Sequence, residues 1–299
     1  MASRRPIAIG IKTSPQGVDW ATLDAAWARI GEHDILESVW MSDHLTDARL
    51  DRHGSSLEAL TTMATLIGRV PGRWVGHIVL SNTFRHPAVL AKAATVLDQA
   101  TGGRFIVGLG AGWHEEEHRS FGIPLPPMPE RFDRFESAVH VLRALFSATA
   151  ATPPGVSRPD PYYPLVEATN EPPPLTPGGP PIWLGGQRRR GIALAAAVAD
   201  GWLMPARGEP GDIDYFDDRR TELLAALEAI GRDPGSFTFA AQVQTGDRPE
   251  TFADALGAAR DAAARGADLV ILGMPARLGA AGVDEVVRAV AEPLRDALG

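Results

Sequence analysis

Short runs of apolar residues recur along the chain, and each is followed by a longer stretch that is compatible with a helix. The runs are continuously apolar and rich in β-branched residues, a pattern typical of parallel strands covered on both faces. Eight of them can be placed, at residues 6–11, 38–41, 74–80, 104–109, 181–184, 201–204, 237–243 and 267–272. Eight strand–helix units predict an α/β fold, a closed (β/α)8 TIM barrel formed by residues 1–299 as a single domain.

The stretches between the runs are rich in alanine and amphipathic. Apolar residues in one of them recur at steps of three, four and seven: Met128, Phe132, Phe135, Val139, Leu142 and Phe146. This stripe predicts a helix that packs on the sheet, with the aromatic rings in the core.

Two connections break the rhythm, residues 113–129 after the fourth run and 147–179 before the fifth. The second holds many of the 25 prolines, a density that excludes a regular barrel helix. Long connections in compact domains often form lids, so both insertions are candidates to cover a site at the carboxyl ends of the strands. For residues 147–179, a surface excursion or a subunit contact is the alternative.

Composition and charge narrow the class of partner. The net charge is −8, and clustered cations are rare outside residues 188–190, which argues against nucleic acid. No apolar run approaches membrane length, and the first residues lead into a strand pattern without an apolar leader. The chain has no cysteine, so redox chemistry would need a bound cofactor. We therefore expect a cytoplasmic protein with a small-molecule ligand.

Polar residues and glycines follow the predicted strands, where TIM barrels carry their active sites. They are Lys12, Asp43, His44, Ser81, Asn82, Thr83, Gly110, Ala111, Gly112, Gly185, Gly186 and Gln187. A histidine such as His44 exchanges a proton near neutral pH, and the adjacent Asp43 can tune or orient it. A loop-capping surface pair is the alternative for these two residues. Lys12, one of two lysines, is most simply a composition effect.

Gly185 and Gly186 precede a predicted helix that begins near Arg188. Exposed main-chain amides at a helix N-terminus favour an anion, so this turn is a candidate phosphate site to which residues 188–190 can add charge. A plain strand-to-helix turn is the alternative.

Two catalytic patterns overlap after the fourth run. Glycines at positions 108, 110 and 112 resemble a dinucleotide fingerprint, but that fingerprint requires glycine at position 113, which is Trp113. His114, Glu115 and His118 match the His-Glu-x-x-His pattern of zinc peptidases. The zinc interpretation requires a helix over residues 113–120 and a third ligand, for which Glu136 is the candidate. The sequence contains neither a Gly-x-Ser-x-Gly elbow nor a Walker loop.

Five segments, in this order, carry a family resemblance: VWMSDHL at 39–45, FRHPAVL at 84–90, GGRFIVGLGAGW at 102–113, ERFDRFE at 130–136 and PIWLGG at 181–186. On these segments the chain resembles the luciferase-like monooxygenase family over nearly its whole length. The resemblance implies a (β/α)8 barrel that binds FMN or the deazaflavin coenzyme F420 across the strand ends, usually as a homodimer. Residues 42–44 and 108–124 are similar to the F420-dependent branch.

The same resemblance implies roles for individual residues. His44 is expected to transfer a proton to the substrate or polarise it, and Asp43 to contact the cofactor. One branch of the family has an acidic glutamate where this chain has Trp113, so Glu115 or His114 is the candidate second acid, while Glu116 and Glu117 are expected to be solvated. The remaining cofactor contacts are expected from Ser81, Asn82 and Thr83, Gly110, Ala111, Gly112 and Trp113, and Gly185, Gly186 and Gln187, with a non-proline cis peptide in the bulge at residues 81–82.

The predicted function is hydride transfer between coenzyme F420 and a small organic substrate. An FMN-dependent monooxygenase supplied by a separate flavin or F420 reductase is the alternative within the family. Outside it, the zinc peptidase and a flavin-binding protein without turnover remain as hypotheses.

Overall fold

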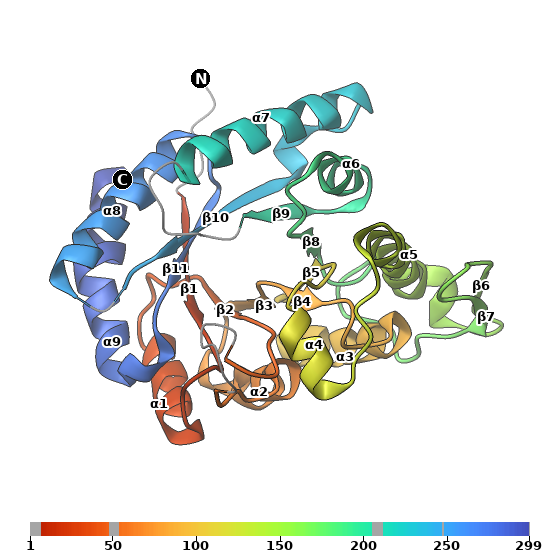
Figure 1. The fold of residues 1–299 in the computed structure, drawn as a ribbon, viewed down its shortest axis with the longest axis horizontal. Coiled ribbons are helices and arrows are strands. Elements are labelled where there is room, and N and C mark those ends of the chain that lie inside the picture. The colour runs from red at the N-terminus through yellow and green to blue at the C-terminus, as the bar shows by residue number, and fades with distance from the viewer. Residues whose placement is uncertain (1–6, 48–53, 205–211, 247, 299) are drawn as a thin grey trace.

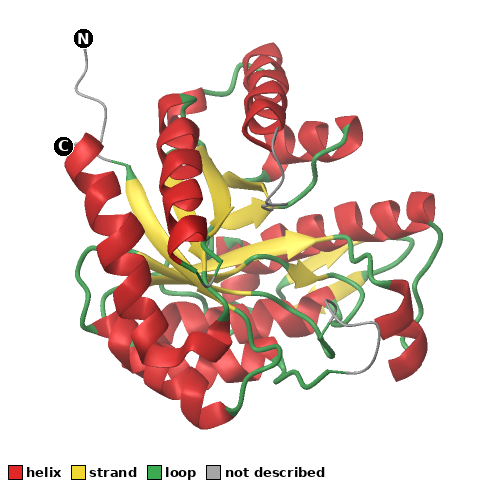
Figure 2. Ribbon diagram, turned by 60° about the vertical axis from the view of Figure 1, so that its left-hand side comes forward, coloured by secondary structure: helices red, strands yellow, loops and turns green. Residues whose placement is uncertain are grey.

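The predicted apolar runs form a closed barrel (Figures 1 and 2). The computed structural model describes residues 7–47, 54–204, 212–246 and 248–298. Its barrel strands are β1 (Ala8–Thr13), β2 (Ser38–Met41), β3 (Trp74–His77), β4 (Leu80–Ser81), β5 (Phe105–Gly110), β8 (Ile182–Leu184), β9 (Gly201–Met204), β10 (Thr238–Gln244) and β11 (Leu269–Gly273). The ladder runs β3-β2-β1-β11-β10-β9-β8-β5, and pairing of β3 with β5 closes it. Each adjacent pair is parallel, so the TIM barrel is confirmed. Of the first predicted strand, residue 6 lies outside the described ranges.

One predicted strand is interrupted. The run at 74–80 contains β3 and the start of β4, which both pair with β5, through Val75 and Gly76 and then through Leu80 and Ser81. The peptide bond between Ile78 and Val79, in the break, is cis. The expected non-proline cis peptide therefore exists, but it precedes the predicted site at residues 81–82 by three residues.

Helices surround the strands, as Figure 2 shows in red around yellow. They are α1 (Trp20–Gly31), α2 (Ala59–Leu66), α3 (Pro87–Ala100), α5 (Met128–Phe146), α6 (Arg189–Val198), α7 (Asp212–Ala229), α8 (Pro249–Ala264), α9 (Gly279–Val286) and α10 (Glu292–Leu298). The predicted stripe of α5 is buried at Phe135, Val139, Leu142 and Phe146, whereas Met128 is exposed. The helices therefore pack by the apolar face that the spacing indicates.

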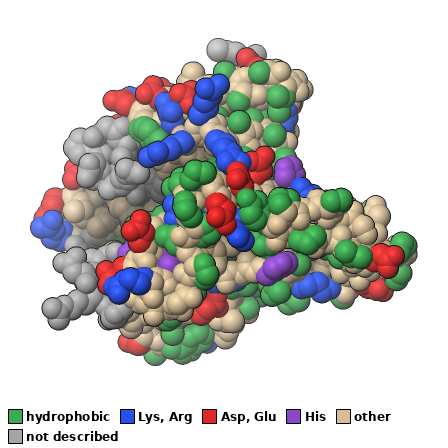
Figure 3. Space-filling model, turned by 45° about the vertical axis from the view of Figure 1, so that its right-hand side comes forward, with side chains coloured by type: hydrophobic (Ala, Val, Ile, Leu, Met, Phe, Trp, Pro, Cys, Tyr) green, Lys and Arg blue, Asp and Glu red, His purple; other side chains and the backbone are tan. Residues whose placement is uncertain are grey.

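The core has two parts. The larger lies between the strands and the surrounding helices, and the smaller fills the barrel interior, where Trp40 stacks on Trp183 with ring centroids 5.3 Å apart. Within the described residues, no helix is both long and apolar enough to span a bilayer. On the face drawn in Figure 3, acidic and basic side chains are interspersed rather than gathered by sign.

The two insertions take different positions. The first contains the short helix α4 (Glu115–Phe121), which lies beside β4 at the barrel (Figure 1). The second forms the hairpin of β6 (Val156–Arg158) and β7 (Leu165–Ala168), which projects beyond α5 at the edge of the molecule. The first insertion is therefore the one that lies at the barrel mouth.

Candidate active site

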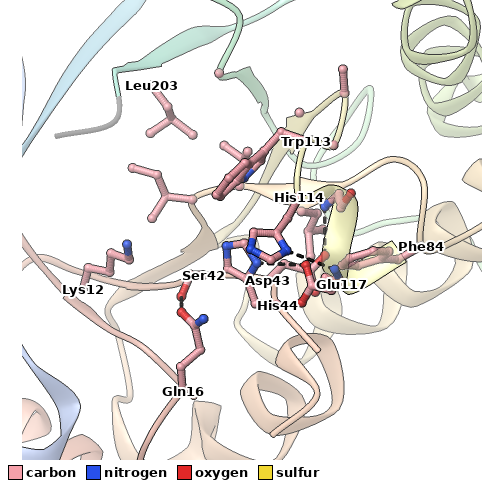
Figure 4. A pocket seen from close by; sticks show the side chains of 18 of the residues that line it. Lys12, Gln16, Ser42, Asp43, His44, Phe84, Trp113, His114, Glu117 and Leu203 are labelled. Atoms are coloured by element: carbon pink, nitrogen blue, oxygen red, sulfur yellow. Dashed lines mark hydrogen bonds and ion pairs between the residues drawn. The ribbon is translucent and has the colours of Figure 1, made fainter. Parts of the chain in front are cut away.

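A pocket of about 510 Å³ opens at the carboxyl ends of the strands (Figure 4). We call it the active-site pocket. Of the residues predicted for the site, its lining includes Asp43, His44, Ser81, Gly110, Ala111, Gly112, Trp113, His114, His118 and Gly185. Asn82 and Thr83 instead line a neighbouring pocket, while Glu115, Gly186 and Gln187 lie outside both linings. Most of the predicted residues are therefore brought together at one mouth of the barrel.

The centre of the pocket is an imidazole–carboxylate pair. Nδ1 of His44, three residues beyond β2, lies 3.1 Å from Oε2 of Glu117 on α4. The other carboxylate oxygen accepts hydrogen bonds from the main-chain amides of Leu45 and Thr46. The Glu117 side chain is 1% exposed. The carboxylate is therefore held at three points, and it fixes the orientation of the ring.

These contacts keep Glu117 ionised. Burial alone would raise its pKa, but the hydrogen bond and charge of His44 and the two main-chain amides outweigh burial, and the pKa lies below its usual value. Because Nδ1 of His44 faces this carboxylate, Nε2 is the nitrogen left for a bound molecule. The edges of the Trp113 and His114 rings border the imidazole, at centroid distances of 5.9 and 6.2 Å (Figure 4).

Helix α4 brings Glu117 into position. His114 is its N-cap, and Nδ1 of His114 accepts a hydrogen bond of 3.1 Å from the amide of Glu117. Because α4 begins directly after His114, Glu117 and His118 are buried on its inner face, whereas Glu115 and Glu116 are exposed. The structure thus places Glu115, the predicted second acid, away from the pocket. The expectation that Glu117 is solvated is wrong.

Asp43 is held in a buried ion pair. Its carboxylate accepts two hydrogen bonds from Arg85, at 2.6 and 2.9 Å, and one of 2.8 Å from the amide of Ser81. Arg85 also pairs with Glu58, the N-cap of α2. Burial opposes the charge of Arg85, but the two carboxylates outweigh it and raise its pKa. Asp43 therefore fixes the end of β4 to the segment that follows β2, and its contact with a cofactor stays a prediction.

A second hydrogen-bond chain ties α4 to β4. Oγ of Ser81 lies 2.7 Å from Oγ1 of Thr83, which lies 2.6 Å from Nε2 of His118. Nδ1 of His118 lies 2.8 Å from the carbonyl oxygen of His114. Both nitrogens of His118 are therefore engaged within the protein.

The zinc hypothesis finds the helix it requires but no assembled ligand set. His118 is engaged as described, Nδ1 of His114 caps α4, and Glu136 forms an ion pair with Arg190 at 2.9 Å. No group of three or more histidine, aspartate or glutamate side chains is arranged to hold a metal ion in the described ranges. The structure does not support the peptidase.

The glycines after β5 and β8 have separate uses. Gly112 has φ +84°, and a Cβ there would lie within 2.8 Å of the Ser81 and Thr83 hydroxyls. Gly185 opens its backbone to the pocket. Gly186 instead packs against Gly191 of α6, where a Cβ on either residue would approach the other's Cα to 2.9 Å. Of the predicted basic run, Arg190 is already paired with Asp133 and Glu136.

Sequence reasoning missed several lining residues. Lys12, which lies at a predicted strand end but was explained by composition, is the next-to-last residue of β1 and lines the pocket. Gln244, the last residue of β10, was not singled out, although its place at a strand end is a signal that could have found it. Gln16 lies in a loop, Phe84 lies after β4, and Gln242 lies inside β10. Their positions in the sequence do not indicate that they line the pocket.

A closed parallel barrel with a histidine, a buried carboxylate and glycine turns at the carboxyl ends of its strands defines the class of TIM-barrel proteins whose site is built from βα loops. The chain belongs to the luciferase-like monooxygenase family, whose sequence model matches residues 15–263.

Two relatives illustrate the likeness in sequence. A phthiodiolone/phenolphthiodiolone dimycocerosates ketoreductase of Mycobacterium tuberculosis is 29% identical over 245 residues, which cover 80% of this chain and 61% of the relative. An F420-dependent glucose-6-phosphate dehydrogenase of Kineococcus radiotolerans is 32% identical over 234 residues, which cover 77% and 65%. The chain thus spans less than two thirds of the length of these relatives.

Solved structures share the fold. An F420-dependent secondary alcohol dehydrogenase in complex with an F420-acetone adduct aligns with a TM-score of 0.74 and 19% identity, covering 95% of this chain and 99% of that one. A monooxygenase from Streptomyces bottropensis aligns with a TM-score of 0.77 and 17% identity, covering 98% and 100%.

Proposed function

We propose that this protein is an oxidoreductase that binds coenzyme F420 in the active-site pocket and transfers a hydride between the cofactor and a small organic substrate. The observation that carries the proposal is the His44–Glu117 pair, an oriented imidazole at the strand ends beside glycine turns. The relatives named for F420 support the choice of cofactor, and the similar proteins include a ketoreductase and two dehydrogenases. An alcohol or the corresponding carbonyl compound is therefore the proposed substrate class.

The residues of the pocket fit a flat heterocycle. Its volume of about 510 Å³ lies in the range of cofactor sites. Ile78, Val79 and Leu203 supply apolar surface, and the backbone of Gly110 and Gly185 lies bare on the same lining. The amides that follow Gly185, towards the N-terminus of α6, would hold an anionic group of the cofactor.

The deazaflavin supplies the hydride-transfer chemistry, so the protein's own task is to orient the reactants, exclude water and move a proton. His44 is proposed to exchange that proton at Nε2 with the oxygen of the substrate. Glu117 holds the ring and stabilises its protonated form. Trp113 is 63% exposed, so a substrate that packs against it would shield the imidazole from solvent.

Cofactor binding and single-turnover kinetics test the proposal together. Dissociation constants for F420 and FMN are measured on the apo protein, followed by the rate of hydride transfer from reduced F420 to a panel of ketones. His44→Ala is expected to lower that rate by ~100-fold or more while it leaves the dissociation constant for F420 nearly unchanged. Unchanged turnover would remove His44 from the mechanism. Tight binding with no reduction of any substrate would instead indicate a cofactor-binding protein without turnover.

The second candidate is an FMN-dependent monooxygenase, favoured by the structural likeness to a monooxygenase. It predicts tighter binding of FMN than of F420 and oxygen consumption when reduced flavin is supplied by a separate reductase. Under the F420 proposal, oxygen consumption stays at background. A homodimer is proposed on the family resemblance, and sedimentation velocity measures it.

A further inference from the structure

A second pocket adjoins the first. We call it the Arg131 pocket. It has a volume of about 700 Å³ and lies between the segment that follows β4 and the start of α5, and Phe84 belongs to the lining of both pockets. Three arginines line it, Arg85, Arg131 and Arg134, against a single acidic residue, Glu130.

Two of these arginines already have counter-ions. Arg134 pairs with Glu130 at 2.8 Å, and Arg85 pairs with Asp43 and Glu58. Arg131 is different. It is only 8% exposed, and no carboxylate of the described residues forms an ion pair with it.

The hydrogen-bonding groups of Arg131 are largely unused. Its Nε atom is buried without a partner, and one terminal nitrogen contacts only the sulfur of Met128, at 3.6 Å. A buried guanidinium that lacks a counter-ion is unfavourable by several kcal/mol in general, and one that serves the fold is normally paired. The position of Arg131 is therefore not explained by stability.

The helix that carries Arg131 gives a second indication. Arg131 is the fourth residue of α5, close to the end where the helix dipole disfavours a cation. Pro127, the N-cap, supplies no side-chain hydrogen bond to the first amides. The start of α3 lies at the same pocket through His86, its N-cap. The first turn of α5, the N-cap of α3 and an unpaired guanidinium thus border one cavity, where the two helix dipoles and the guanidinium favour an anion.

We propose that the Arg131 pocket is an anion-binding subsite, in which Arg131 pairs with a carboxylate or phosphate group. The planar guanidinium binds either oxyanion through two parallel hydrogen bonds. Because the pockets share Phe84, the anion can belong to a molecule whose reacting part lies beside His44. It is then either the charged chain of the cofactor or a charged group of the substrate. The proposal of an anion-binding subsite does not depend on which cofactor the protein uses.

The test begins on the protein without cofactor, with inorganic phosphate and γ-glutamylglutamate as probes. Saturable binding to the wild type is measured by calorimetry. Arg131→Met is expected to weaken binding of at least one probe ~10-fold or more, because about that factor separates a charge-assisted pair from none. Arg134→Met is the matched control, since Arg134 lines the same pocket but is already paired, and it should change the affinity less than 3-fold or so.

Thermal unfolding separates this role from a structural one. Without ligand, Arg131→Met should melt at or above the wild-type temperature, because it removes an uncompensated buried charge. Arg131→Lys keeps the positive charge but cannot form two parallel hydrogen bonds to an oxyanion. Its affinity for the probes should therefore lie between those of the wild type and Arg131→Met. It supplies the measurement if the Met variant does not fold. The proposal is overturned if the wild type binds neither probe, or if the Lys and Met variants bind both as tightly as the wild type.

Whole coenzyme F420 and its deazariboflavin core, which lacks the phosphate and carboxylate groups, then identify the source of the anion. If Arg131→Met weakens binding of F420 but not of the core, the anion belongs to the cofactor. If it weakens neither while phosphate binding is lost, the same subsite serves the substrate. Equal loss for both forms overturns the proposal, because Arg131 would then act through the fold. A protein that binds no cofactor at all would refute the proposed function, and the phosphate titration would still decide the subsite.

Discussion

At the scale of single residues, the pairing of His44 with Glu117 determines which nitrogen of the imidazole can act. The carboxylate accepts from Nδ1 at 3.1 Å, so neutral His44 carries its proton there and offers a lone pair at Nε2. Protonation of Nε2 then yields an imidazolium that the ionised carboxylate stabilises. Because the Glu117 carboxylate holds the ring at Nδ1, His44 can both accept and donate a proton at Nε2.

Glu117→Gln tests this assignment. One oxygen would still accept from the amides of Leu45 and Thr46, so the new NH2 group would face Nδ1 and reverse the tautomer. We expect the rate of hydride transfer to fall roughly 10- to 100-fold with little change in KM, because neutral His44 would then carry its proton at Nε2 and offer no lone pair there.

Glu115→Gln is the matched control, since it makes the same chemical change two residues away on the exposed face of α4. It should leave the rate of hydride transfer as in the wild type. A larger loss from Glu115→Gln than from Glu117→Gln would restore Glu115 as the second acid and reject the orienting role of Glu117.

The sequence could not decide among the three consecutive glutamates. Each is compatible with a helix, and the one that faces the barrel depends on the residue at which the helix begins. His114 is that residue because its ring caps the amide of Glu117, and this is a local geometry that the pattern of polar and apolar positions does not encode. His44 and the glycines at 110 and 112 could be predicted as site residues, because they lie at or just after the ends of strands that the apolar pattern locates.

At the scale of elements, α6 approaches the barrel through glycine. Gly191, in its first turn, lies against Gly186 in the turn after β8, and the indole of Trp202 donates to the carbonyl of Gly186 at 2.8 Å. The turn that leads from the pocket to α6 is thus held by contacts that leave no room for a side chain.

Gly191→Ala should therefore destabilise the protein, although alanine is the better helix former. Overpacking of a close contact typically costs about 1–3 kcal/mol. Gly257→Ala in α8 is the control, because a Cβ there meets nothing within 4 Å, and it should stabilise by about 0.5–1 kcal/mol. Chemical denaturation of the two variants measures both. Stabilisation by both substitutions would refute the close contact.

The elements could be predicted because buried parallel strands are continuously apolar, and all eight runs coincide with strands to within a few residues. Three features escaped. Helix α4 is too short for an amphipathic period, and the β6–β7 hairpin lies in a proline-rich segment. The break between β3 and β4 is marked in the run at 74–80 by no turn residue that would separate two strands. Each departs from the strand–helix repeat, and periodicity detects only the repeat.

At the scale of the whole molecule, a histidine enclosed at the end of β3 makes stability depend on pH. His77 is fully buried, its Nδ1 has no hydrogen-bond partner, and burial lowers its pKa to about 4 from 6.5. The unfolded chain therefore binds a proton at higher pH than the folded protein does. The stabilisation is complete above pH 6.5 and is lost as pH falls towards 4, by on the order of 3 kcal/mol.

His77→Gln should flatten this dependence. The free energy of unfolding of the wild type is expected to fall between pH 7 and pH 4.5, a range above the region where Glu58, with its pKa lowered to about 2, begins to contribute. Denaturant titrations at several pH values give both slopes. Equal slopes for the two proteins would show that His77 is not the responsible group.

The break between β3 and β4 has a consequence for how this barrel can diversify. Both flanking segments stay attached to β5, while Ile78 and Val79 between them face the active-site pocket. The barrel closes through the pairing of β3 and β4 with β5, and this pairing does not use Ile78 or Val79. Their side chains belong to or pack against the interior core and also line the pocket. Exchange of one apolar residue for another at these positions would change the shape of the pocket lining, and with it substrate selectivity, while the strand pairing of the barrel stays the same.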